Sequence, residues 1–151
     1  MLVAGAAILW RRTVTWGAAA ITAYNTMIVV ILMDGRMVLR NAGEFLAETH
    51  TAEQVAIVAG GLIVYATSAK IDAARAAWLI RGGLLTFGIF ALLFGTAHFA
   101  FMNLTAPLVP KWLPASSEFW GYATGLGHIA ASPAILTGVR ARLPATLLTV
   151  M

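Results

Sequence analysis

The chain has 151 residues, of which 60% are hydrophobic and 11% charged, and its mean hydropathy is +0.85. A soluble domain usually carries about 25% charged residues, so the composition predicts an integral membrane protein. The isoelectric point near 10.1 and the formal charge of +4 do not indicate nucleic-acid binding, because the basic residues are scattered between apolar runs. The absence of cysteine excludes disulfides, thiolate metal ligands and dithiol redox motifs.

Four apolar segments are candidates for membrane spans. Residues 13–33 form the first uncharged run of the roughly 20 residues that a bilayer requires. The segment of residues 54–69 is shorter than this. It can still cross the bilayer if its helix extends by one turn or if its flanking charged side chains reach the membrane interface. Residues 82–102 and 119–136 complete the set. The sequence therefore predicts an all-α fold, a transmembrane helical bundle of about four spans.

Both chain ends are expected to be partial helices. Residues 1–10 are apolar but too short to span alone, and residues 143–151, with Pro144 near a first helical turn, open a helix that the chain does not complete. An offset of 127 residues places the Ala-Ile-Leu at residues 7–9 on that at residues 134–136, each before an arginine-bearing turn. This pattern predicts a duplicated unit, with its first copy ending in residues 1–81 and its second beginning in residues 82–151. We expect the functional polypeptide to be longer.

The basic residues predict the orientation. Seven of them (Arg11, Arg12, Lys70, Arg75, Arg81, Arg140 and Arg142) fall on one side of the predicted spans, and three (Arg36, Arg40 and Lys111) on the other. The side with seven is expected to be cytoplasmic. Residues 34–53 are then an outer loop, which either lies partly on the membrane as an amphipathic piece or is simply solvated.

Two histidines lie inside apolar runs. His98 recurs at spacings of three and four with Gly88, Ala91 and Gly95, so these residues share one helix face. His128 shares a face in the same way with Gly121, Gly125 and Ser132. Membrane helices associate through such small residues, so both imidazoles are expected to face the interface between residues 82–102 and 119–136.

Three interpretations of these histidines remain open. In the first, each imidazole only contributes to helix packing. In the second, the histidines form a quinone or proton site, in which an imidazole donates a hydrogen bond to a quinone oxygen. In the third, they bind a metal ion or a haem. His98 is expected about 6 Å, and His128 about 13 Å, from the outer end of its helix. This difference in depth disfavours one haem between them.

The segment joining the last two predicted spans, residues 103–118, is rich in proline. Pro107, Pro110 and Pro114 oppose helix and favour an extended chain, while Trp112, Trp120 and Tyr122 suit the headgroup level. The expected structure is a rigid interfacial cap, which either anchors the protein or covers a lipid-accessible site. For a quinone site the candidate residues are His98, His128, Trp112, Trp120 and Tyr122.

Several stretches resemble the DoxX family of small bacterial membrane proteins. They are FGTAHF at residues 94–99, VPKWLP at residues 109–114 and FWGYATGLGHIAASPAILTG at residues 119–138, followed by a basic turn and PATLLT. The resemblance covers residues 82–151 and implies a four-helix, multi-pass protein of the bacterial inner membrane. Relatives include small subunits of a thiosulfate:quinone oxidoreductase and parts of membrane redox complexes. The shifted register and the missing cysteines depart from that pattern.

The sequence contains no HExxH, P-loop, GxSxG or dinucleotide fingerprint, and no catalytic or metal-ligating residues are assigned. The predicted function is an accessory integral-membrane subunit of a larger redox or electron-transport complex. Its expected partners are other membrane subunits, lipids and a quinone, without nucleic acid. The alternative is a DoxX-type subunit of an enzyme that oxidises thiosulfate or sulfur and reduces quinone.

Overall fold

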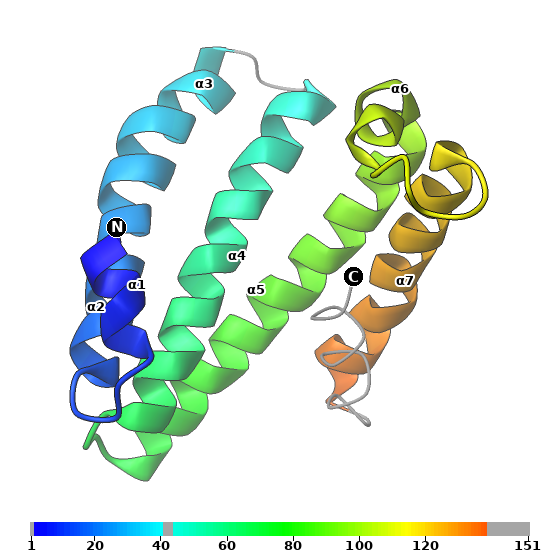
Figure 1. The fold of residues 1–151 in the computed structure, drawn as a ribbon. Helices are drawn as coiled ribbons and strands as arrows, with labels where there is room; N and C mark the ends of the chain where they lie inside the picture. The colour runs from blue at the N-terminus through cyan, green and yellow to red at the C-terminus, as the bar shows by residue number, and fades with distance from the viewer. Residues whose placement is uncertain (1, 41–43, 139–151) are drawn as a thin grey trace. The chain divides into compact units, whose positions relative to one another are not determined.

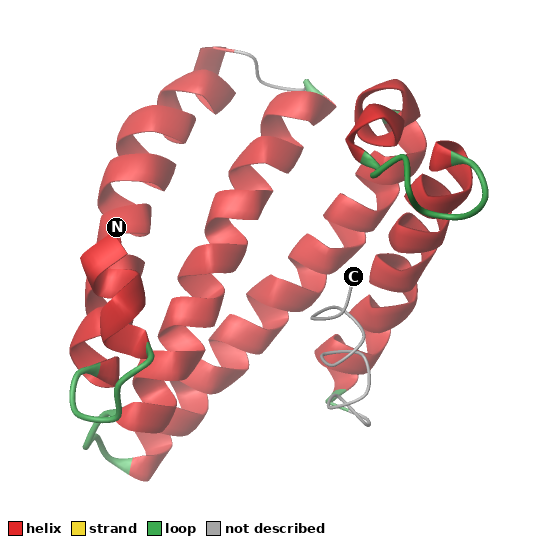
Figure 2. Cartoon of the chain, viewed as in Figure 1, coloured by secondary structure: helices red, strands yellow, loops and turns green. Residues whose placement is uncertain are grey.

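A computed structural model describes residues 2–40 and 44–138 of the chain, except for the side chains of residues 45–50. Within these residues every regular element is helical, which confirms the all-α prediction (Figures 1 and 2). The chain divides into two compact units, Met1–Phe87 and Gly88–Met151, and the boundary falls within the long helix α5 (Ala73–Ala100). The basic turn and partial helix expected over residues 139–151 lie outside the described residues.

The first unit is built on helix-to-helix packing. A short helix α1 (Leu2–Ile8) folds back along α2 (Val14–Tyr24), and α2 packs against α4 (Phe45–Ser68). Near the start of α2, the hydroxyl of Thr15 donates to the carbonyl oxygen of Ser68 at 3.1 Å, which ties together adjacent ends of α2 and α4. The turns from α1 to α2 and from α4 to α5 therefore lie at the same end of this unit (Figure 1).

The first predicted span is longer than the sequence indicated. From α2 the helix continues through a π-helical segment η1 (Asn25–Asp34) into α3 (Gly35–Arg40), so residues 14–40 form one helical rod. π-Helices are rare and occur mostly as single turns, which makes a ten-residue segment unusual. Within it, the side chains of Asn25 and Asp34 are buried, and the Asn25 amide donates to the Ile21 carbonyl oxygen at 2.9 Å.

The expectation of an outer loop over residues 34–53 was wrong. Asp34 belongs to η1, residues 35–40 to α3 and residues 45–53 to α4, so the described part of this segment is helical apart from Glu44. The segment contains no proline, and its charged residues were mistaken for a break in the helical pattern. Charge ends the hydrophobic part of a membrane helix, but the backbone hydrogen bonds continue beyond it.

The second unit joins the end of α5 to α7 (Ser117–Thr137) through two short helices, α6 (Met102–Thr105) and η2 (Ala106–Leu108). The Ser116 hydroxyl caps α7 by accepting a bond from the Phe119 backbone N–H at 3.1 Å. At the other end, Gly138 has a φ of +72°, a left-handed conformation that glycine adopts without strain. The third and fourth predicted spans are thus present as helices, each extending beyond its predicted start.

The helices carry small residues inside and large ones outside. The buried apolar residues are alanines apart from one isoleucine: Ala18, Ala56, Ala59, Ala66, Ala91, Ala97, Ala131 and Ile135. Large apolar side chains such as Trp16, Met27 and Ile89 are more than half exposed. A soluble protein buries such side chains, so this distribution suits helices surrounded by lipid.

Two helices among the described residues are long and apolar enough to cross a membrane, Val14–Arg40 and Ala73–Ala100. Only 17% of the most apolar window of each is buried, whereas the core helix of a soluble protein is mostly buried. At about 1.5 Å per residue, α4 with 24 residues and α7 with 21 residues also reach the roughly 30 Å of a hydrocarbon core. Four spans remain a prediction for this fold.

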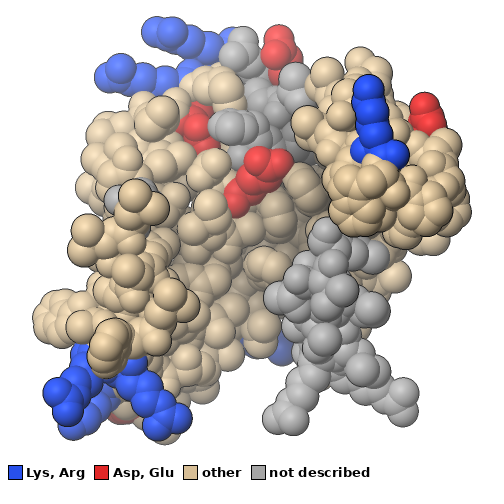
Figure 3. All heavy atoms as spheres, in the orientation of Figure 1, with Lys and Arg blue, Asp and Glu red and all other residues tan. Residues whose placement is uncertain are grey.

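The ends of the first unit differ in charge from its middle. Arg11 and Arg12 lie in the turn between α1 and α2, and Lys70 in the turn between α4 and α5, whereas Arg40 ends α3 at the opposite end. On the face drawn in Figure 3, the long middle stretch of this unit carries no Lys or Arg. Basic residues at the two ends of a surface without Lys or Arg between them match a helical unit that crosses the membrane.

We predict that Lys70 is cytoplasmic and Lys111 is on the outer side. Both side chains are exposed, and the chain has no native cysteine, so single variants Lys70→Cys and Lys111→Cys test this directly. In intact cells, a membrane-impermeant thiol reagent is expected to label the Lys111 variant several-fold more than the Lys70 variant. Permeabilised cells serve as the control, in which both label. Preferential labelling of the Lys70 variant would reverse the orientation.

Candidate functional site: a histidine pair between two helices

The second unit brings His98 of α5 and His128 of α7 together. Their ring centroids are 5.8 Å apart, and the two ring planes differ by 18°. The Phe94 ring lies edge-on to both imidazoles, with centroid distances of 4.8 Å to His98 and 5.1 Å to His128. His98 is buried and His128 is partly buried. The prediction that both histidines face one helix interface is confirmed.

Each imidazole is held by its own helix. Nδ1 of His98 donates to the Phe94 carbonyl oxygen, and Nδ1 of His128 donates to the Thr124 carbonyl oxygen, both at 2.9 Å. Both bonds reach back four residues, to a carbonyl one turn earlier on the same helix face. These bonds fix the orientation of each ring, and they leave Nε2 as the ring nitrogen that does not bond to the helix backbone. Within the described part of the chain, neither Nε2 has a hydrogen-bond partner.

Glycines allow the two helices to approach closely around the pair. A Cβ added at Gly125 would lie 2.8 Å from the His98 Cβ and 2.9 Å from the Gly95 carbonyl oxygen. A Cβ added at Gly95 would lie 2.8 Å from the Gly125 carbonyl oxygen. Any larger residue would therefore push the helices apart. The small-residue faces predicted on both helices are confirmed at these positions.

A buried interhelical hydrogen bond lies one turn beyond the pair on α7. The Ser132 hydroxyl, which is 1% exposed, donates to the Gly88 carbonyl oxygen at 2.8 Å. This oxygen belongs to the same α5 face as Gly95 and His98, as the spacing predicted. The bond fixes the register of α5 against α7, and in this register the two imidazoles lie beside each other.

The two rings differ in depth by at most the 5.8 Å between their centroids, whereas the helix ends predicted a difference of roughly 7 Å. The segment after α5 is not an extended cap, because α6 and η2 pack against the first turns of α7. Pro107 lies at the start of the 3₁₀ helix η2. Backbone N–H groups at a helix start have no partner within the helix, so the missing N–H of proline costs no hydrogen bond there.

The aromatic residues Trp112, Trp120 and Tyr122 were proposed for the quinone site, but the described structure gives none of them a ring contact with the histidine pair. Trp112 is 80% exposed and Trp120 donates its indole N–H to the Pro114 carbonyl oxygen, which fastens the loop before α7. Tyr122 is exposed and packs on Phe99, with ring centroids 5.3 Å apart. The exposure of Trp112 suits an anchor at the headgroup level.

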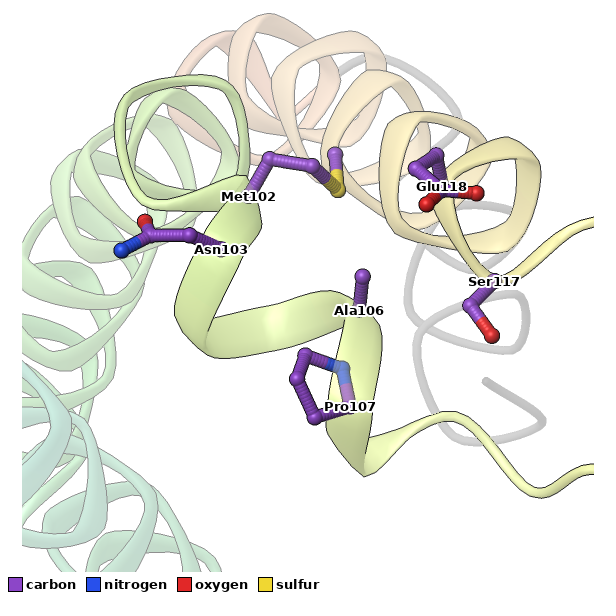
Figure 4. A pocket seen from close by; sticks show the side chains of 6 residues that line it. All are labelled: Met102, Asn103, Ala106, Pro107, Ser117 and Glu118. Atoms are coloured by element: carbon purple, nitrogen blue, oxygen red, sulfur yellow. The ribbon is translucent and has the colours of Figure 1, made fainter.

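A separate hollow lies beyond the pair, between the α6–η2 segment and the start of α7. Its volume is about 360 Å³, and it is lined by Met102, Asn103, Ala106, Pro107, Ser117 and Glu118 (Figure 4). The Met102 side chain reaches α7, where it would meet a Cβ added at Gly121. Hydrogen bonds from the Glu118 backbone N–H and the Ser116 side chain lower the pKa of Glu118, so this rim is anionic at neutral pH. The histidines do not line this hollow.

The site does not offer a multidentate metal centre. Among the residues with described side chains, no group of three or more His, Cys, Asp or Glu could hold a metal ion.

Comparison with known proteins gives no further guidance. No protein-family model, curated protein or solved structure matches the chain. The candidate site therefore stands on its own geometry.

Phe94 was missed as a member of the site. It contacts both imidazoles edge-on, and its carbonyl oxygen accepts the His98 bond. The available signal was its position four residues before His98, on the same helix face. A phenylalanine in an apolar helix is usually a packing residue, and only the approach of α7 gives this one a polar neighbour on each side.

Proposed function

We propose that the chain is a DoxX-like accessory subunit of a larger redox or electron-transport complex in the bacterial inner membrane. In this role it packs against other integral subunits, and its histidine pair contacts a quinone-type carrier. The observation that carries the proposal is the pair itself. Two imidazoles, His98 and His128, stack between apolar helices with their Nε2 atoms unbonded by the described residues.

The setting of the pair supports a lipid-soluble ligand. Ionisable residues inside membrane helices are costly and are usually retained for function. Phe99 and Tyr122, each 46% exposed, add an apolar surface on the same two helices. The headgroup of a quinone-type carrier is a flat ring that bears oxygen atoms, so it can pack on aromatic side chains beside the histidine nitrogens.

The outward-facing apolar surface supports the accessory role. Exposed Leu92, Phe119 and Leu126 lie on α5 and α7, where lipid or a neighbouring subunit would cover them. Mild solubilisation of native membranes, affinity purification and mass spectrometry should recover the chain together with at least one other integral subunit and with quinone. Recovery of the chain alone, without partner or quinone, would contradict the proposal.

Replacement of His128 by asparagine separates a packing role from a ligand site. Asparagine retains hydrogen bonding, so the free energy of unfolding is expected to fall by about 1 kcal/mol or less, the scale of interhelical hydrogen bonds in membranes. Quinone co-purification is expected to fall to background, because the stacked imidazole is lost. Thermal unfolding in detergent and quantification of bound quinone provide the two measurements. Unchanged quinone content in the variant would leave packing as the role of the pair.

A further inference from the structure

We propose that the histidine pair selects the reduced carrier: it binds a quinol or another apolar phenol through the hydroxyl hydrogen, in preference to the oxidised quinone. This inference rests on the proposed contact with a quinone-type carrier. It concerns the direction of the hydrogen bonds, which the positions of the two carbonyl partners determine.

The tautomer of both rings follows from their partners. The carbonyl oxygens of Phe94 and Thr124 can only accept, so the nitrogen facing each must carry the hydrogen. A neutral imidazole has one N–H, so in the neutral form of each ring Nε2 of His98 and Nε2 of His128 are lone-pair acceptors. The earlier expectation that an imidazole of the pair donates to a quinone oxygen therefore does not fit the neutral rings.

The acceptor atoms have no competing partner in the described structure. Neither Nε2 is among the described polar atoms that are buried without a partner, so both keep some accessible surface. The described neighbours Phe94 and Gly125 supply no donor side chain to the pair, because Phe94 is apolar and Gly125 has no side chain. The Nε2 atoms of His98 and His128 can therefore accept a hydrogen bond only from a group outside the described unit.

The chemistry of the two redox forms then differs at this site. A quinone presents only carbonyl oxygens, which face the Nε2 lone pairs without forming a hydrogen bond. A quinol presents hydroxyl groups that can donate to Nε2. A site built around polar groups rejects an analogue that leaves them unpaired, and in a desolvated setting this discrimination is substantial. Phe99 and Tyr122 provide apolar area that both forms use equally.

The test compares decylubiquinol with decylubiquinone, binding each to the full chain in lipid nanodiscs under anaerobic conditions. The quinol is expected to bind about tenfold more tightly or better, because a bound quinone would cover an Nε2 atom and leave it unpaired. His128→Phe keeps an aromatic ring against Phe94 but removes one of the two acceptors, so the preference should fall several-fold, and His98→Phe with His128→Phe should bring it to unity. Thr96→Val is the matched control, since the Thr96 hydroxyl bonds only the Leu93 carbonyl oxygen of its own helix.

A second measurement does not depend on the ligand. Nitrogen-15 chemical shifts of the His98 and His128 side chains should report hydrogen on Nδ1 and a bare Nε2 in both rings. An Nε2–H tautomer in either ring, or equal or tighter binding of the quinone, would overturn the inference. Absence of binding by both redox forms would instead remove the proposed function on which it rests, and with it the inference.

Discussion

Replacing Gly125 by leucine is expected to lower the free energy of unfolding by about 3 kcal/mol, the upper part of the usual range for overpacking. The added Cβ would lie 2.9 Å from the Gly95 carbonyl oxygen, and a backbone atom cannot rotate away as a side chain can. The helices must separate, and the bond from Ser132 to Gly88 breaks with them. Quinol binding should be lost together with stability, because separation of α5 from α7 also parts the imidazoles.

The control for Gly125 is Gly82→Leu. Gly82 lies on α5 with no atom within 4 Å of an added Cβ, so leucine there meets open space and improves helix propensity. Reversible unfolding in mixed micelles, followed by circular dichroism, compares the two variants. Equal stability of the Gly125 and Gly82 variants would contradict the close helix approach that the structure places at the histidine pair.

Replacing Gly61 by leucine is expected to destabilise the first unit by a similar amount, about 3 kcal/mol. On α4, a Cβ at Gly61 would run into the Thr22 hydroxyl of the preceding helical rod, and the Ala18 carbonyl oxygen lies only 3.6 Å away. The Thr22 hydroxyl oxygen is buried in the described structure, so neighbouring atoms restrict its movement away from an added Cβ.

The neighbouring Gly60 provides a matched control, because an added Cβ there meets nothing within 4 Å. Gly60→Leu changes the same helix by the same side chain, one residue earlier, and is expected to leave stability within about 0.5 kcal/mol or raise it. The two variants are to be unfolded side by side under the same conditions. A Gly60 variant as unstable as the Gly61 variant would show that leucine at either position harms α4, and would refute the proposed contact with Thr22.

The helix starts illustrate what local sequence reasoning misses. The start of α5 was predicted at residue 82, but the helix begins at Ala73 because the Asp72 carboxylate accepts from the Arg75 backbone N–H at 2.9 Å and pairs with its side chain at 3.0 Å. Hydropathy marks the part of a helix that lipid can surround, and this part is shorter than the hydrogen-bonded helix. A capping pattern at Asp72 was available in the sequence and was not used.

The sequence by itself determined that the chain is helical, that its helices are apolar on the outside, and that small residues share a face with each histidine. These features depend on composition and on spacings of three and four, which act within one helix. The register of α5 against α7, the helical path of residues 102–108 and the edge-on position of Phe94 depended on tertiary structure. They arise from contacts between helices, at Gly95, Gly125 and the Ser132 bond, which no pattern within a single helix contains. The histidine pair is therefore encoded as two separate faces in the sequence and becomes a site only when those faces meet.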